Sequence, residues 1–311
     1  MGSNSFRVEI ARIVRGRYVR IDYVKETVRL GAGLDANGLL SDEAAERGLT
    51  CLRRFAARLE GIPAQHVRAV ATQTLREAKN RDAFLLRAQA ALGHSIEVIS
   101  GREEARLIYA GVAHLQPSER TRLVIDIGGR STEMILGRGK EPIKAESFAV
   151  GSVSLSLRFF GDGTLDANAF RAAQVAAGAE LEEALLPFAP QCWEEALGSS
   201  GTAGAVSQLL VAIGHDDGVI TPARLRALIE RCIDAGHIDR IELPGLKPER
   251  RPVIAGGLAL LYTFAAQFGV EHLLRASGIL DEPPLEQLGR GDGFGDLQTL
   301  GGGVDQRNQR I

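Results

Sequence analysis

The chain has 311 residues, of which 45% are hydrophobic and 24% charged, and its net charge is −2. These values are ordinary for a soluble globular protein of about two domains, and they exclude a general attraction to nucleic acid or to anionic membranes. Cys51, Cys192 and Cys232 are far apart, and the six histidines show no metal-binding spacing. We therefore expect reduced thiols, no zinc site and a cytoplasmic protein without a signal peptide.

The first part of the chain predicts a β-hairpin followed by alternating helices and strands. Residues 5–14 and 18–28 alternate between β-branched and polar side chains around Arg15-Gly16-Arg17, as in two strands joined by a turn. Ser41 is the expected N-cap of a helix that stops at Gly61. The next predicted elements are a strand over 66–72, a helix over 81–92 capped by Asn80, a strand over 95–100, and a helix over 102–115 with Leu107, Ile108 and Gly111 inward.

The second part repeats this order, which predicts α/β layering twice. The expected strands are 122–127, 132–137, 145–150, 193–197 and 271–276, and the expected helices are 152–160, 167–188, 203–213, 222–235 and 249–268. The uncharged stretch Val253 to Val270 is long enough to span a bilayer, but its glycines favour a buried helix. We expect lobes over 1–118 and 119–288, and a disordered glycine-rich tail over 289–311.

A glycine–serine turn that leads into a strand occurs twice. Gly2-Ser3-Asn4-Ser5 and Gly128-Gly129-Arg130-Ser131 start matching segments, in which Gly2, Ser5 and Arg12 recur as Gly128, Ser131 and Arg138. The backbone N–H groups of such turns can cradle phosphate oxygens, so two turns suggest two similar lobes that face one anionic ligand. In this register Asp126 matches the position just before Met1, so we expect a strand and a carboxylate to be missing from the first lobe.

Asp126 and Glu133 are candidate ligands of a divalent cation. Asp126 ends an apolar strand beside the second turn, where α/β sheets place ligands. A carboxylate beside a phosphate cradle is repulsive unless a cation lies between them, which implies Mg²⁺. Glu133, across the turn, could bind the same cation or position water. The alternative is that Asp126 caps the turn and Glu133 is a solvated strand residue.

Three further motifs have both a functional and a structural interpretation. Gly198-Ser199-Ser200-Gly201-Thr202 precedes a helix, whose N-terminus attracts anions, although such turns are common. Arg76 could clamp a phosphate or be an ordinary loop arginine. Glu103 and Glu104 open a helix, where acidic side chains usually stabilise the helix dipole.

Taken together and in this order, the motifs resemble the exopolyphosphatase/guanosine pentaphosphate phosphohydrolase (Ppx/GppA) family over about residues 1–282. The segments that carry the resemblance are Gly2–Phe6, Val67–Thr72 with Thr74-Leu75-Arg76 and Asn80, Ile99–Ile108, Val124–Gly129, Ser131-Thr132-Glu133 and Gly198–Thr202. The resemblance implies an α/β, actin-like (ribonuclease-H-like) fold of two lobes, with the site in the cleft between them. It also implies Mg²⁺-dependent hydrolysis of a terminal phosphoanhydride in polyphosphate or guanosine pentaphosphate, a nucleotide of the stringent response.

The resemblance also implies a role for each site residue. The general base falls on Glu104, the metal and water-positioning acids fall on Asp126 and Glu133, and the phosphate-binding arginine falls on Arg76. The phosphate-binding backbone falls on three segments, represented by Ser3, Asn4 and Ser5, by Gly128, Gly129 and Ser131, and by Gly198, Ser199, Gly201 and Thr202. A homodimer is compatible with the family, whereas nucleic-acid and membrane partners are not expected.

The chain departs from the family pattern in four ways. The strand and acid expected before Gly2 are absent, Arg130 stands where the family has a third glycine, and Ala276–Pro283 lacks an expected acid and arginine. The C-terminal helical region of long family members is also absent. These departures keep a non-enzymatic binder of polyphosphate or nucleotide open, whereas the Glu-Glu-Ala-Arg context of Glu104 argues against a related ATPase or sugar kinase.

Overall fold

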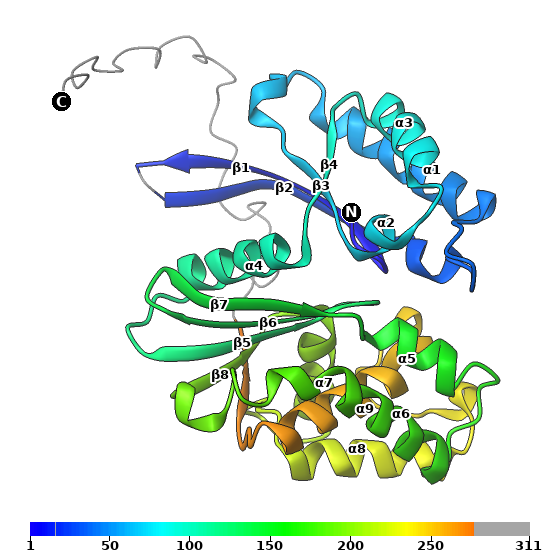
Figure 1. Cartoon of the computed structure of the whole chain (residues 1–311), viewed down its shortest axis with the longest axis vertical. Coiled ribbons are helices and arrows are strands. Elements are labelled where there is room, and N and C mark those ends of the chain that lie inside the picture. The colour runs from blue at the N-terminus through cyan, green and yellow to red at the C-terminus, as the bar shows by residue number, and fades with distance from the viewer. Residues whose placement is uncertain (16, 277–311) are drawn as a thin grey trace.

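The computed structural model describes residues 1–15 and 17–276, so the predicted tail lies outside the described residues. Two large hydrophobic cores form, one from residues between Phe6 and Ile96 and the other from residues between Leu123 and Leu273. We call residues 1–98 the first lobe and residues 121–276 the second lobe. Figure 1 shows the first lobe, in blue and cyan, stacked on the second, in green to orange.

The first lobe contains the predicted hairpin and two short parallel strands. β1 (Ser5–Val14) pairs antiparallel with β2 (Arg17–Thr27), and β3 (Ala69–Ala71) pairs parallel with β4 (Ile96–Val98). The helices are α1 (Asp42–Leu59), α2 (Gln73–Glu77) and α3 (Arg81–Leu92). Ser41 caps α1 as predicted, since its Oγ accepts a hydrogen bond from the Ala44 N–H.

Asn80 is the N-cap residue of α3, as predicted, but its side chain makes no capping hydrogen bond. Its amide instead bonds both backbone groups of Leu40, accepting from the N–H and donating to the carbonyl at 2.9 Å each. Asn80 thereby satisfies the backbone of a loop that is distant in sequence, a role that local sequence cannot indicate.

The second lobe is a five-stranded mixed sheet in the order β7-β6-β5-β8-β9, flanked by helices. Its strands are β5 (Thr121–Ile127), β6 (Thr132–Arg138), β7 (Glu141–Phe148), β8 (Glu195–Gly198) and β9 (Leu273–Arg275). Its helices are α5 (Ser152–Phe159), α6 (Ala167–Glu180), α7 (Gly201–Ala212), α8 (Pro222–Ala235) and α9 (Arg251–Gln267). The apolar α9 is buried in the core, as expected, and no described helix is long and apolar enough to cross a membrane.

Helix α4 (Gly101–Leu115) connects the lobes, and in Figure 1 it lies along their boundary. It packs against the sheet of the second lobe, because Ala105, Tyr109 and Val112 join a small core with strand residues. The predicted inner face was wrong at Leu107, whose exposed fraction is 38%. The face with Ala105, Tyr109 and Val112 meets the sheet, and this orientation turns Leu107 away from it.

The internal repeat is visible in the backbone. The Gly2 N–H donates to the Ser5 carbonyl at 3.1 Å, and the Gly128 N–H donates to the Ser131 carbonyl at 2.9 Å. The strand after each turn carries a register shift at the matching place, after Ile10 in β1 and after Leu136 in β6. The two lobes are therefore built on one plan, as the repeated turns predicted.

One position of this plan differs between the lobes. In the second lobe β5 lies between β6 and β8, whereas the described part of the first lobe has no strand that joins β1 to β3. Met1 marks the place, because its amine donates to the Val70 carbonyl at 2.6 Å and its carbonyl accepts from the Thr72 N–H. Apart from these two bonds at Met1, no strand of the described residues pairs with the inner edges of β1 and β3.

Candidate active site

Two carboxyl groups lie side by side at the end of the sheet of the second lobe. The register of the hairpin places Asp126 of β5 directly opposite Glu133 of β6, and Glu133 opposite Ser147 of β7. Side chains that are directly opposite share one face of a sheet. Ser147 Oγ donates to Glu133 Oε1, and Ser199 Oγ donates to Asp126 Oδ2, each at 2.8 Å. The structure therefore unites Asp126 and Glu133, as expected for a shared pocket.

Glu104 approaches this row from the first turn of α4. Gly101 lies so close to β7 that an added Cβ would stand 2.4 Å from Ser147 Cβ, which shows how tightly the helix start meets the row. Arg76 of α2 donates to Glu104 Oε2 at 2.9 Å and to the Ile99 carbonyl at 3.0 Å. Arg76, the predicted phosphate-binding residue, is thus paired with Glu104, the predicted general base. The two side chains lie together between the lobes.

The pKa values of all three carboxyl groups are raised, chiefly by burial. Burial raises the pKa of Glu133 to about 8, and the neighbouring Glu104 and Asp126 add to this shift. Burial also raises the pKa of Asp126, against the Ser199 hydrogen bond and the nearby Arg7. For Glu104, burial raises the pKa most strongly, Arg76 opposes it and Asp126 supports it. Clustered carboxyl groups with raised pKa values are typical of a functional site.

The two glycine turns face each other across the lobes. A Cβ added to Gly129 would stand 3.3 Å from Ser3 Cβ and 3.5 Å from Asn4 Cβ. Ser3 Oγ accepts from Thr74 Oγ1 at 2.8 Å, and the Ser3 carbonyl accepts from the Gly31 N–H. The predicted phosphate-binding turns therefore meet, with the Ser3 side chain itself holding the first turn in place.

The third predicted loop adjoins Asp126 through Ser199. Ser200 caps α7 by accepting from the N–H groups of Thr202 and Ala203, and Thr202 Oγ1 donates to the Ile127 carbonyl at 2.9 Å. These hydroxyls serve the local fold. Two backbone N–H groups of the loop are also used within the fold, because the Ser199 N–H donates to the Ile125 carbonyl and the Thr202 N–H donates to Ser200 Oγ. Gly201 also leaves room for Arg250, whose Nη2 would stand 2.3 Å from an added Cβ.

A cationic cavity between the lobes was not predicted. Its volume is about 310 Å³, and its lining includes Tyr23 and Lys25 of β2, the loop Ser199–Gly201, Lys247 and Arg250. Burial lowers the pKa of Lys25 to about 8, and the cations Arg250, Arg7 and Lys247 lower it further. Positive groups held close enough to repel each other favour an anionic ligand.

The Tyr23 hydroxyl adds to this picture, because it is buried without a hydrogen-bond partner in the described part of the chain. A buried polar group of this kind is stabilised when a ligand supplies the missing bond. Local sequence could not reveal the cavity, since its cations are scattered from β2 to the start of α9. The pairing of Glu133 with Asp126, by contrast, follows from the hairpin register alone.

Whether these residues fit a divalent cation depends on what completes its coordination. Within residues 1–15 and 17–276, no three His, Cys, Asp or Glu side chains form a group that could hold a metal ion. Mg²⁺ is, however, commonly held by one or two carboxylates together with substrate phosphate oxygens and water. Asp126 and Glu133 are opposite each other and repel as anions, so this pair fits a cation that arrives with a phosphate.

Arg130 occupies the third-glycine position without backbone strain, since its φ is not among the positive values. Its guanidinium does not project freely toward a ligand. It forms an ion pair with Glu77 of the first lobe, Nη2 to Oε2 at 2.8 Å, and Nη1 donates to the Gly31 carbonyl at 3.2 Å. A pairing of Arg130 with phosphate would therefore require these contacts to break.

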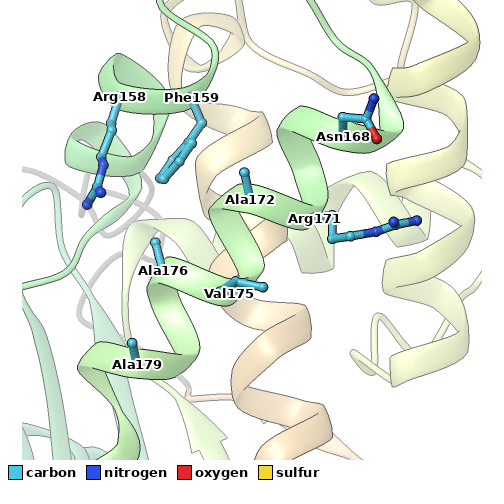
Figure 2. Close-up of a pocket in the computed structure, with 8 residues that line it drawn as sticks. All are labelled: Arg158, Phe159, Asn168, Arg171, Ala172, Val175, Ala176 and Ala179. Atoms are coloured by element: carbon cyan, nitrogen blue, oxygen red, sulfur yellow. The ribbon is translucent and has the colours of Figure 1, made fainter.

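A second hollow lies on the outer surface of the second lobe, away from the predicted site. Figure 2 shows it between α5 and α6, with Phe159, Ala172, Val175, Ala176 and Ala179 along its side. Its volume is about 480 Å³. Its lining brings together no carboxyl groups and none of the predicted site residues.

The sequence is similar to that of one known protein family over nearly its whole length. The sequence model of the Ppx/GppA phosphatase family matches residues 9–282. A Haemophilus influenzae protein with the provisional name exopolyphosphatase is 40% identical over 299 residues, which are 96% of this chain and 93% of that protein.

Solved structures show the same fold. An exopolyphosphatase from Cytophaga hutchinsonii has a TM-score of 0.78 at 23% identity, covering 89% of this chain and 92% of that chain. The Aquifex aeolicus PPX-GPPA enzyme has a TM-score of 0.71 at 23% identity, covering 89% of this chain and 94% of that chain. With the repeated lobes described above, these likenesses confirm the predicted actin-like two-lobed fold.

Proposed function

The chain belongs to the Ppx/GppA phosphatase family, whose members hydrolyse phosphoanhydrides, and we propose that it removes terminal phosphate from inorganic polyphosphate, with guanosine pentaphosphate as the second candidate substrate. The observation that carries the proposal is the meeting of Asp126, Glu133 and Glu104 beside two facing glycine turns. The adjacent cationic cavity supports a polyanion as the substrate.

Polyphosphate is favoured over guanosine pentaphosphate by the lining of that cavity. The lining has four cations and a single carboxylate, Glu249, whereas Tyr23 is the aromatic ring among the lining residues that could stack on a base. The four cations are Lys25, Lys247, Arg250 and Arg275. A repeating chain of phosphates can use each cation in turn through charge-assisted hydrogen bonds. The Haemophilus influenzae relative carries an exopolyphosphatase name, which points in the same direction.

The residues divide the chemical work as follows. Glu104 accepts the proton of the attacking water, and Arg76 favours the ionised form that this role needs. The N–H groups of the two turns hold the phosphates and stabilise the negative charge that develops on them. Asp126 and Glu133 would hold a divalent cation, which when bound supplies charge neutralisation for the phosphate oxygens.

The test is release of orthophosphate from polyphosphate by the purified protein, measured beside binding of the same polyphosphate. We expect release that requires a divalent cation and stops with a chelator. Release that persists under complete chelation would remove the cation from the proposal.

A non-enzymatic binder is the alternative, and one observation favours it. Arg130 ties the second turn to Glu77, so the turn is less open to phosphate than a glycine would leave it. The altered segment that begins at Ala276 lies almost wholly outside the described residues. Tight binding of polyphosphate without any phosphate release would establish this alternative.

A further inference from the structure

A chain of polar contacts leads from the second glycine turn to Glu104. Arg130 Nε and Nη2 both contact Glu77 Oε2, at 2.9 and 2.8 Å. The other carboxylate oxygen of Glu77, Oε1, accepts a hydrogen bond from the Gln73 side-chain amide. Gln73 Oε1 in turn accepts from Arg76 Nε at 3.0 Å and from Arg76 Nη2 at 2.6 Å. Arg76 finally donates to Glu104 Oε2 at 2.9 Å.

The Arg130 end of this chain is built into the fold. A Cβ on Gly31 would stand 2.7 Å from Arg130 Cδ, so the glycine leaves the room that the side chain needs. The Gly31 carbonyl also accepts from Arg130 Nη1. The Arg130 side chain is only 21% exposed, which strengthens a contact between charges relative to one on the open surface.

Resting on the proposed function, we propose that Arg130 is a positioning residue: by neutralising Glu77 across the lobes, it keeps Arg76 on Glu104. Arg76 and Glu77 are adjacent in α2, and the Gln73 amide bridges them. Arg130 is the cation that the described part of the chain brings to Glu77. Without it, the free carboxylate of Glu77 competes with Glu104 for the Arg76 guanidinium, and the base loses its partner.

This competition gives a signature that a purely structural role would not produce. Removing Arg130 alone should harm the reaction, but removing Glu77 as well should restore it, because the competing charge is then gone. A merely stabilising ion pair also recovers in the double variant, because a single removal leaves one charge without its counterion. The signature that separates the two roles is therefore the rescue of kcat together with a move of Arg76 from Glu104 to Glu77 when Arg130 alone is removed.

The experiment compares Arg130→Met, Glu77→Gln and the double variant by polyphosphate hydrolysis, and by crystal structures that locate Arg76. We expect Arg130→Met to lower kcat roughly tenfold with little change in KM. We expect the double variant to return to within about threefold of the original kcat. The structures should show Arg76 turned from Glu104 to Glu77 in Arg130→Met, and back on Glu104 in the double variant.

The matched control is Arg224→Met, which breaks an ion pair with Asp217 inside the second lobe. The Arg224 side chain is 23% exposed, much like Arg130, and its Nη1 lies 2.6 Å from Asp217 Oδ1. It should leave kcat unchanged. A double variant slower than Arg130→Met, or an Arg76–Glu104 pair that survives in Arg130→Met, would overturn the proposal. If the original chain releases no phosphate, the proposed function fails, while the position of Arg76 in the crystals still decides the role of Arg130.

Discussion

Glu133 shows how one residue combines a structural cost with a functional position. It is 1% exposed, accepts a hydrogen bond from Ser147 and lies opposite Asp126. A carboxyl group placed so is disfavoured as an anion, both by burial and by like charges. A fold optimised for stability alone would not place it there, whereas a site that receives a cation and phosphate gains from a poised carboxylate.

The raised pKa of Glu133 predicts a pH-dependent gain in stability for Glu133→Gln. The carboxyl group ionises near 4.5 in the unfolded chain and at about 8 in the folded chain, so the unfolded state binds fewer protons between these values. The stability of the original protein therefore falls as pH rises through this window. Without added divalent cation, Glu133→Gln should melt at least about 3 °C higher at pH 8 and about equally at pH 4.

Thermal unfolding over this pH range makes the measurement. The control is Glu141→Gln at the exposed start of β7. Its melting temperature should differ from that of the original protein by the same amount at every pH. A Glu133→Gln gain that is the same at every pH would refute the raised pKa.

Lys25 is the residue through which to test the cationic cavity. Its ammonium is partly buried among Arg250, Arg7 and Lys247, so it can make a charge-assisted bond to a phosphate chain. Lys25→Met should raise KM for polyphosphate roughly tenfold with a smaller effect on kcat, and it should weaken the dependence of KM on salt. Steady-state kinetics at two ionic strengths measure both effects. Lys140→Met, at an exposed turn, is the control, and an equal effect there would show that only overall charge matters.

At the scale of elements, the described part of the first lobe has no strand at the position that β5 occupies in the second lobe. In the second lobe, β5 lies between β6 and β8. In the described residues of the first lobe, no strand lies between the corresponding edges of β1 and β3. Open strand edges lose backbone hydrogen bonds and invite association between molecules.

A strand placed ahead of Met1 should therefore stabilise the fold. An added segment of apolar residues that ends in Asp directly before Met1 can pair with both edges and supply the counterpart of Asp126. Several backbone bonds of about 0.5–1.5 kcal/mol each should raise the melting temperature by several degrees. The control is a protein extended by a segment of equal length that is rich in Pro and Gly. Calorimetry compares the melting temperatures of the two extended proteins, and gel filtration compares their association. Equal melting temperatures for the two would contradict the prediction.

Elements with strong local signals could be predicted from sequence, and elements defined by distant contacts could not. Ser41 predicts the start of α1, and the alternation of side chains over β1 and β2 predicts the hairpin. Helix α2 was missed because five residues carry too little periodicity, yet it brings Arg76 to Glu104. Leu107 was placed inward because it is apolar, although the sheet selects the face with Ala105 and Tyr109.

In the candidate site too, residues that are close in sequence could be placed together, whereas residues brought together by distant contacts could not. Asp126 and Glu133 belong to one hairpin, so sequence spacing could place them together. Lys25 and Arg250 come from different lobes, and only the folded chain shows that they face one cavity. Likewise, no local pattern could show that Arg130 reaches across to Glu77 rather than toward a ligand.

At the scale of the molecule, the repeated turns meet where the lobes meet. Gly129 of one lobe faces Ser3 and Asn4 of the other, and Glu104 comes from the helix that joins the lobes. A ligand bound by both turns would contact both lobes at once, and these contacts would orient its phosphate relative to Glu104.

The most direct measurement of this account is the rate of orthophosphate release from polyphosphate by the original chain and by Glu104→Gln, with Mg²⁺ present. Glutamine preserves the size of the side chain but cannot accept the proton of water, so kcat should fall by roughly 10²–10⁴-fold while polyphosphate binding is retained. Glu103→Gln, one residue earlier in α4, should keep most of the activity. A Glu104→Gln protein that turns over within a few-fold of the original rate would contradict the account, because water activation would then not depend on the carboxyl group around which the site is built.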